Sequence, residues 1–168
     1  MSKEIITFID NFNIRFSKEE DVPLILNFIK ELAEYEKLSN EVVATEEILK
    51  ESIFLKRSAE VIIGEYEGIP VGFALFFHNF STFLGKPGIY LEDLYIRPEM
   101  RGKGFGKVML SYLAKLTLER DCGRLEWSCL DWNKSSIDFY KSLGAMRMEE
   151  WTVHRVTGNT LKELGRNF

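Results

Sequence analysis

The feature that most constrains the fold is a strand, a glycine-rich loop and a helix that follow one another without a break. The segment PGIYLEDLYIRP (87–98) predicts a strand that ends at Pro98. Apolar residues at helical spacing predict a helix over 107–123, with Gly123 at its end. RLEWSCLDW (124–132) predicts the next strand. Because strand–helix–strand units imply parallel pairing, part of the sheet is expected to be parallel.

The rest of the chain adds antiparallel strands and more helices. AEVIIGEYEGIPVGFALFFHNF (59–80) predicts two strands joined by a turn at Glu67-Gly68. FNIRFS (12–17) predicts a first strand and MEEWTVHRVTG (148–158) a last one. Helices are predicted over 17–37, 44–56 and 135–144. The fold class is therefore α/β (mixed α+β), with a central mixed sheet and helices on both of its faces.

The chain length and composition favour one globular domain over residues 1–168, with no internal repeat or linker. A net charge of −4 argues against a nucleic-acid partner. No run approaches the ~18 apolar residues of a membrane span. Cys122 and Cys129 do not have metal-ligand spacing, so we expect two reduced thiols and no metal site. Together these features predict a cytoplasmic protein.

The loop RGKGFGK (101–107) carries three glycines just before a helix. It does not match the GxxxxGK[ST] phosphate loop, because Val108 follows Gly106-Lys107. It does not match GxGxxG either, because Lys107 stands at the third glycine position. Successive unobstructed N–H groups and the positive end of the helix would suit a pyrophosphate. The alternative is a solvated glycine-rich turn without a ligand.

The neighbouring segments narrow this choice. YLEDLYI (90–96), RGKGFG (101–106) and WNKSSIDFYKSLGA (132–145) together resemble the motifs of the GCN5-related N-acetyltransferases, the GNAT superfamily. Within it the chain looks most similar to the diamine (spermidine/spermine) acetyltransferases, over nearly its whole length. The resemblance implies a splayed sheet of the GNAT fold, acetyl-CoA as the acetyl donor and a primary amine as the acceptor. It also implies a homodimer, with the last strand as a contact or exchange element.

The resemblance assigns the donor site to two segments and one strand. The strand is expected to bulge and splay, which would free main-chain groups of Leu94 and Ile96 for the pantetheine arm. RGKGFGK would clamp the pyrophosphate, and the second segment would contact the rest of the cofactor. The expected cofactor-binding residues are Leu94, Tyr95, Ile96, Arg101, Gly102, Lys103, Gly104, Phe105, Gly106, Lys107, Asn133, Lys134, Ser135, Ser136 and Tyr140.

Two residues are expected to move protons. An alkylammonium has a pKa near ~10 and must lose a proton before it can attack. The resemblance assigns the binding and deprotonation of the amine to Glu92, and protonation of the departing thiolate to Tyr140. Strand alternation places Glu92 on the face of Leu94 and Asp93 on the opposite face. Glu92 could instead be a carboxylate that only pairs with a cation, and Tyr140 could simply be packed.

The acceptor is the least constrained part of the site. The resemblance points to carboxylates and aromatics, which suit a cationic chain. The expected substrate-binding residues are Tyr35, Glu36, Glu92, Glu126, Trp127, Ser128, Glu150 and Trp151. The related polyamine enzymes carry Asp and Trp where this chain has Ser81 and Phe83, so one acceptor-side charge is missing. Short diamines, thialysine-like amino acids, a protein amine and a non-catalytic acyl-CoA-binding module therefore remain open.

Overall fold

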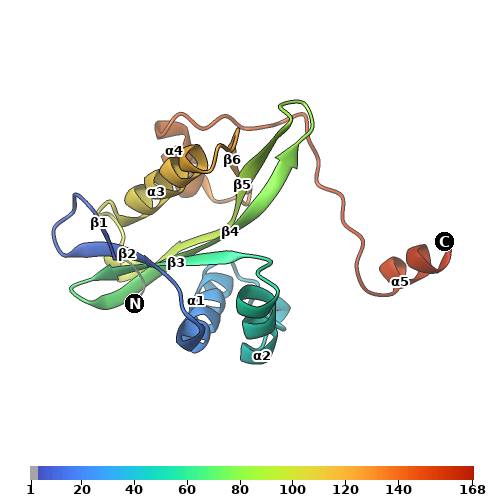
Figure 1. The fold of residues 1–168 in the computed structure, drawn as a ribbon, viewed down its shortest axis with the longest axis horizontal. Helices are drawn as coiled ribbons and strands as arrows, with labels where there is room; N and C mark the ends of the chain where they lie inside the picture. The colour runs from blue at the N-terminus through green and yellow to red at the C-terminus, as the bar shows by residue number, and fades with distance from the viewer. Residues whose placement is uncertain (1–3) are drawn as a thin grey trace. The chain divides into compact units, whose positions relative to one another are not determined.

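The computed structural model describes residues 4–168, which divide into two compact units, residues 4–128 and residues 129–168. We describe each unit by itself. In chain order the elements are β1 (Ile5–Ile6), β2 (Phe12–Phe16), η1 (Glu19–Asp21), α1 (Val22–Tyr35), η2 (Ser39–Glu41), α2 (Glu46–Leu49), η3 (Lys50–Leu55), β3 (Glu60–Tyr66), β4 (Ile69–Ser81), β5 (Lys86–Ile96), η4 (Pro98–Met100), α3 (Phe105–Glu119), β6 (Leu125–Trp127), α4 (Lys134–Ser142) and α5 (Gly158–Arg166) (Figure 1).

The first unit is built on one six-stranded sheet whose spatial order follows the chain, from β1 to β6. Neighbouring strands are antiparallel except β5 and β6, which are parallel. The hairpin between β3 and β4 turns at Glu67 and Gly68, whose φ angles of 53° and 77° are both left-handed. Such a turn matches the twist of the flanking strands. The mixed sheet predicted from the sequence is therefore confirmed.

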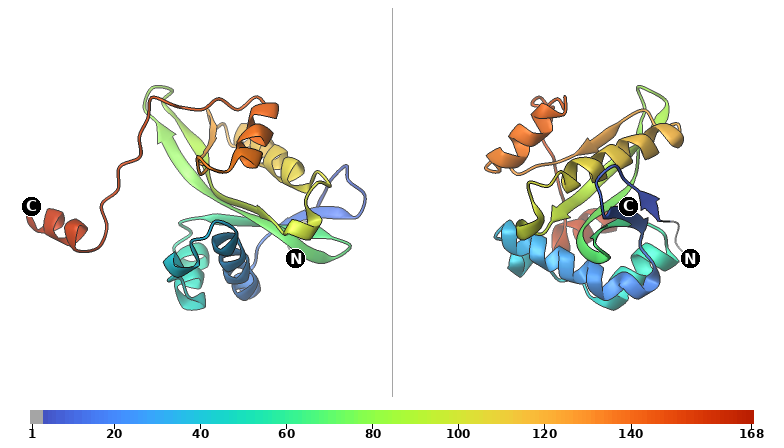
Figure 2. Two further views of the ribbon diagram at one scale, coloured as in Figure 1. Left: turned by 180° about the vertical axis from the view of Figure 1, so that it is seen from behind. Right: turned by 90° about the vertical axis from the view of Figure 1, so that its left-hand side faces the viewer.

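Helices cover both faces of this sheet, as expected (Figures 1 and 2). On one face, apolar residues of α1, α2 and η3 pack on β3, β4 and β5. Phe28 of α1 stacks on Phe73 of β4, with ring centroids 5.4 Å apart. Burying a side chain of this size contributes about 1.5–3 kcal/mol relative to leaving it exposed.

The other face is covered by α3, whose buried side chains run from Phe105 to Thr117. Phe105, at the start of α3, stacks on Phe12 of β2 with ring centroids 4.2 Å apart. Gly64 of β3 lies under this pair, and a Cβ there would come within 2.9 Å of Phe12 Cζ. The helix can therefore approach the sheet closely only because this position lacks a side chain. The packing places the start of α3, and the loop before it, at the end of β5.

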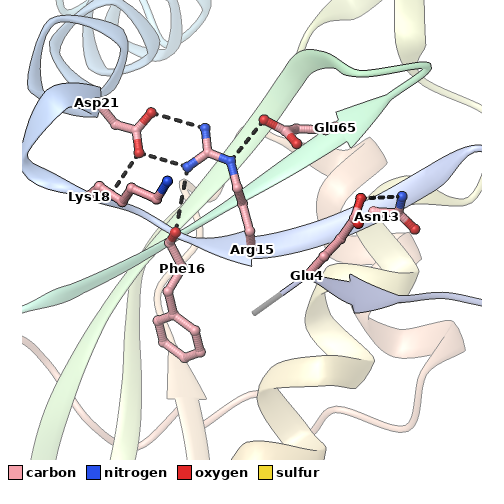
Figure 3. Close-up of polar contacts among 7 residues, drawn as sticks. All are labelled: Glu4, Asn13, Arg15, Phe16, Lys18, Asp21 and Glu65. Carbon is pink, nitrogen blue, oxygen red and sulfur yellow. Dashed lines mark hydrogen bonds and ion pairs between the residues drawn. The ribbon is translucent and has the colours of Figure 1, made fainter. Parts of the chain in front are cut away.

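An ion-pair cluster fixes the start of α1 to the sheet (Figure 3). The Arg15 guanidinium of β2 donates to Asp21 in a bidentate pair, at 2.7 and 2.9 Å. Its Nε donates to Glu65 of β3 at 2.9 Å. Asp21 also accepts the backbone N–H of Lys18 at 2.7 Å. The hydrogen bonds that Arg15 and Lys18 donate to Asp21 therefore stabilise the turn that leads into α1.

Three predictions about elements need correction. The last strand, predicted over 148–158, is absent: residues 145–157 form no helix or strand, and α5 follows. A strand requires a neighbouring strand for its backbone hydrogen bonds, and no described strand of this chain pairs with that segment. The strand predicted over 124–132 is limited to β6, and the helix predicted over 44–56 continues as the π-helix η3 after α2.

Candidate active site

The strand β5 has two halves that differ in their neighbours. Ile89, Tyr90 and Leu91 pair with β4 on one side and with β6 on the other. From Glu92 to Ile96 the strand pairs only with β4 among the described residues. The sheet therefore opens between β5 and β6, as the resemblance implied for a splayed sheet.

Main-chain groups of β5 point into this opening. The N–H of Arg97 donates to Val71 of β4 at 3.0 Å, so Arg97 directs its main-chain groups toward β4. Because these groups alternate in direction along an antiparallel strand, those of Leu94 and Ile96 point away from β4. Both residues were expected to expose main-chain groups here. The Ile96 carbonyl already accepts from Arg101 Nε at 2.9 Å. The rest of this edge can bind an extended chain in the manner of an added strand.

A β-bulge occurs in β5 at Glu92. Leu91 lies opposite Phe76 and Asp93 lies opposite Leu75, so Glu92 has no partner on β4. Leu91 and Leu94 consequently share a face, although they are three positions apart. Simple alternation, which placed Glu92 on the face of Leu94, does not apply across a bulge. The bulge lies where the strand loses its second neighbour.

Two neighbouring carboxylates act on Asp93 at this bulge. Burial, followed by the negative charges of Glu92 and Glu36, together raise the pKa of Asp93 to about 6. Burial also raises the pKa of Glu36, at the end of α1. Within residues 4–168, Asp93 has no ion pair or hydrogen bond through its side chain. The sequence reasoning ranked Asp93 below Glu92 because alternation placed it on the opposite face, and this environment makes it a candidate site residue.

The glycine loop leaves a row of backbone donors open. Gly102 and Gly104 have φ angles of 77° and 86°, which L side chains rarely adopt. The first intrahelical bond of α3 runs from Val108 N–H to Gly104 O at 3.0 Å. The N–H groups of Phe105, Gly106 and Lys107 therefore lack intrahelical acceptors. Their positive helix end suits an anion such as a pyrophosphate.

The side chains of the loop are used differently from its backbone. Phe105 is buried against Phe12, so only its main chain is available to a ligand. Tyr95 is also buried, and burial followed by the charge of Glu31 raises its pKa. Lys103 places Nζ 4.9 Å from the centroid of the Tyr66 ring, and Lys107 is exposed. Arg101 donates from Nε to the carbonyl of Ile96 at 2.9 Å.

The expected acceptor residues of the first unit lie at three elements, of which β5 carries Glu92. Tyr35 and Glu36 close α1, while Glu126 and Trp127 lie on β6 and Ser128 follows it. The Glu126 carboxylate is already engaged, since Oε1 lies 2.9 Å from both Asn79 Nδ2 and Arg124 Nε. Ser128 shares a 2.7 Å hydrogen bond with the Tyr90 hydroxyl. Glu126 therefore has less capacity for a cationic substrate than Asp93.

The second unit carries the remaining expected residues. Asn133 is buried and its side chain accepts the Ser136 N–H at 3.2 Å, which caps α4. Lys134 and Ser135 are exposed, and Tyr140 is half-buried beside Phe139. Glu150 and Trp151 lie in the irregular segment before α5, where Trp151 is 72% exposed. The cofactor role of α4 and the acid role of Tyr140 stay predictions.

Other kinds of site find no support in the part of the chain that the structure describes. Over residues 4–168, no group of three or more His, Cys, Asp or Glu side chains could hold a metal ion. Among those same residues, no helix has the length and apolar character that crossing a membrane requires.

Comparisons with known proteins agree with this geometry. The model of the acetyltransferase (GNAT) family matches residues 26–145. Thialysine N-epsilon-acetyltransferase of Bos taurus is 40% identical over 163 residues, which cover 90% of this chain and 95% of the relative. Spermidine/spermine N(1)-acetyltransferase-like protein 1 of Homo sapiens is 30% identical over 169 residues, covering 94% of this chain and 24% of the relative.

A solved structure supports the same fold. An integron cassette protein from the mobile metagenome of V. cholerae has a TM-score of 0.78 at 25% sequence identity, covering 93% of this chain and 98% of that protein. The open edge of β5, the glycine loop before α3 and these relatives lead to one conclusion. The chain belongs to the acetyltransferase (GNAT) family and is an acetyl-CoA-dependent N-acetyltransferase that acts on amines.

Proposed function

We propose that this enzyme acetylates the terminal primary amine of a small cationic substrate, either a short diamine or an amino acid with a thialysine-like side chain. The observation that carries the proposal is the group of Asp93, Glu92 and Glu36, in which Asp93 has no cationic partner within residues 4–168. A substrate ammonium would supply the missing positive charge. The relative named as a thialysine acetyltransferase supports this substrate class. The loss of an acidic residue at Ser81 disfavours a long polyamine.

The same carboxylates would also receive the proton of the amine. An amine with a pKa near ~10 enters the site protonated and must be deprotonated before it attacks. Glu92, exposed at the bulge, is the proposed first contact for the ammonium. Asp93, with its pKa of about 6, is close to the working pH at which a general base is most effective. Glu92 and Asp93 would therefore bind the cation and accept its proton as a pair.

The donor side would be held by main-chain groups. Acetyl-CoA supplies the acetyl thioester. The N–H groups of Phe105, Gly106 and Lys107 are the proposed pyrophosphate contacts, because α3 leaves them without acceptors. Leu94 and Ile96 would bind the extended arm along the open edge of β5. Tyr140 is the proposed acid for the departing thiolate, and Asn133 to Ser136 would contact the donor from α4.

The assembly is also a proposal. We propose a cytoplasmic homodimer in which the C-terminal segment contacts a second copy of the chain. That segment carries apolar side chains that the chain itself leaves exposed, namely Trp151, Val153, Val156, Leu161 and Leu164. Exposed apolar side chains at this density are typical of an interface. A single domain over 1–168 is part of the same proposal.

The test is release of free thiol from acetyl-CoA with a panel of amines. Short diamines, thialysine, spermine and a lysine peptide would be compared by kcat/KM. We expect the highest values for the short diamines or thialysine. Preference for the peptide would contradict the substrate class, and tight CoA binding without turnover on any amine would indicate a non-catalytic module.

The acid role of Tyr140 has a separate test. Tyr140→Phe should lower kcat by about 100-fold, because a general acid contributes at least that much, while CoA binding changes little. Tyr112→Phe is the matched control, since Tyr112 of α3 packs beside Phe16 of β2. Equal kcat for Tyr140→Phe and the unaltered enzyme would remove Tyr140 from this role.

A further inference from the structure

Arg101, the first residue of the glycine loop, packs against two tyrosine rings. Its guanidinium carbon lies 4.3 Å from the centroid of the Tyr35 ring and 5.7 Å from that of Tyr95. Its Nε donates to the Ile96 carbonyl at 2.9 Å. Arg101 is thus held between the last turn of α1 and the open edge of β5, at the entrance to the loop.

This arrangement leaves most of the guanidinium donors available. A guanidinium has five N–H donors. Across residues 4–168 only the Nε–H of Arg101 has an acceptor, so the four N–H groups on Nη1 and Nη2 lack one. A side chain that is fixed through Nε and through its flat face keeps its terminal groups free to form a bidentate contact with an anion.

The ring under Arg101 is itself fixed. Glu31, one helical turn before Tyr35, accepts from Arg97 Nε at 3.1 Å and from Arg97 Nη2 at 3.0 Å. Arg97 also donates to the Pro70 carbonyl at 3.2 Å and lies over the Phe28 ring. These contacts bind α1 to the end of β5 and so hold the helical turn that carries Tyr35 beside Arg101.

We propose that Tyr35 is a positioning residue for the acetyl donor, acting through Arg101. The ring holds the guanidinium beside the loop before the donor arrives, which lowers the entropic cost of binding the pyrophosphate. The resemblance assigned Tyr35 to the amine, whereas its ring contacts Arg101 of the glycine loop, on the proposed donor side. This inference rests on the proposed donor function of the loop.

The test separates effects on the two substrates. The variants are Tyr35→Leu, Tyr35→Phe, Arg101→Gln and the double variant Tyr35→Leu/Arg101→Gln. CoA affinity is measured by calorimetry, and KM is measured for acetyl-CoA and for the best amine. Tyr35→Leu should weaken CoA binding by about three- to tenfold, the range of one cation–π contact. The KM of Tyr35→Leu for the amine should stay within about twofold of that of the unaltered enzyme. Tyr35→Phe keeps the ring and should bind CoA as the unaltered enzyme does.

The double variant decides whether the effect passes through Arg101. It should bind CoA no more weakly than Arg101→Gln alone, because the ring has nothing left to hold. Effects that multiply, or a rise in amine KM with unchanged CoA affinity, would overturn the inference. If Tyr35→Leu does not fold, Tyr35→Met removes the ring at similar volume and carries the same expectations. If the unaltered protein does not bind CoA, the proposed donor function of the loop fails. If it binds CoA and Tyr35→Leu binds CoA equally well, only the inference about Tyr35 fails.

Discussion

Two aspartates in the first unit show how one residue type serves opposite purposes. Asp21, before α1, receives two bonds from Arg15 and one from the Lys18 N–H (Figure 3). Burial would raise the pKa of Asp21, but these donors outweigh it, so the pKa lies below its usual value. Asp93, at the bulge of β5, has burial and two like charges around it, and its pKa rises to about 6.

The difference lies in which groups surround each carboxylate. At Asp21 the fold supplies all the donors that an ionised carboxylate needs, so the residue stabilises the fold. At Asp93 residues 4–168 supply none, so ionisation there costs stability unless a cation arrives from outside. A buried group whose charge the protein does not satisfy is a candidate functional group. Substitutions should therefore affect stability in opposite directions at the two positions.

The largest effect is expected for Asp93→Asn. We expect kcat/KM for the amine to fall about 100-fold, because the variant can neither hold the ammonium nor accept its proton. Stability at pH 8 should rise by about 1–2 kcal/mol, since a half-buried charge without a partner in residues 4–168 disappears. Urea unfolding and steady-state kinetics measure the two quantities.

The pH dependence of that stability gain has a defined sign. The folded-state pKa of Asp93, about 6, lies above its ordinary value of 3.8. Stability from this group is therefore fully present below about pH 4 and lost as the pH rises through 6. Asp93→Asn should gain stability above pH 6 and show no gain at pH 4. Asp121→Asn, at an exposed carboxylate, is the control. A loss of stability at pH 8 would contradict the comparison.

Asp21→Asn should have the opposite effect on stability and little effect on chemistry. Removing the carboxylate leaves Arg15 with Glu65 alone, which should cost about 2 kcal/mol at pH 7. Because the folded-state pKa is lowered, this contribution is present above about pH 4 and lost as the pH falls through the folded-state value. The difference from the unaltered protein should shrink at pH 3.

The control for Asp21→Asn is Glu19→Gln, in the same turn. Glu19 pairs with Lys50 at 2.6 Å, but both side chains are about half exposed. Such a pair contributes about 0–1 kcal/mol, so this variant should change stability little. Comparable losses of stability in Asp21→Asn and Glu19→Gln would show that burial does not strengthen the ion pairs of Arg15. A large change in kcat for Asp21→Asn would remove the distinction between the two aspartates.

The parts of the site that depend on local sequence were predictable, while those that depend on pairing were not. Gly102 and Gly104 could be placed in a loop before α3 because glycine spacing and helical periodicity are properties of a short segment. The bulge at Glu92 depends on which β4 residues lie opposite β5. The 91–93 segment alone carries no such information, and Asp93 was therefore ranked below Glu92.

The C-terminal segment illustrates the same limit. The stretch 148–158 has the composition of a strand, and Trp151 and Val153 alternate as strand residues do. Its backbone has no paired neighbour among the described strands of this chain, so it remains irregular. Tyr35 was assigned to the amine because Tyr35-Glu36 resembles the acceptor-side pair of the diamine enzymes, and only the three-dimensional structure reveals its contact with Arg101 of the glycine loop.

The smallest expected effect tests the like charges around Asp93. Glu36 is the weaker of the two neighbouring charges that raise the pKa of Asp93. Glu36→Gln should lower that pKa and move the acid limb of the kcat/KM profile to lower pH by about 0.3 units, a modest interaction across a partly solvated distance. Glu34→Gln, at an exposed position on the same helix, should leave the profile unchanged. A shift to higher pH would show that Glu36 does not act on Asp93 through its charge, because removing a nearby negative charge can only favour ionisation of a carboxyl group.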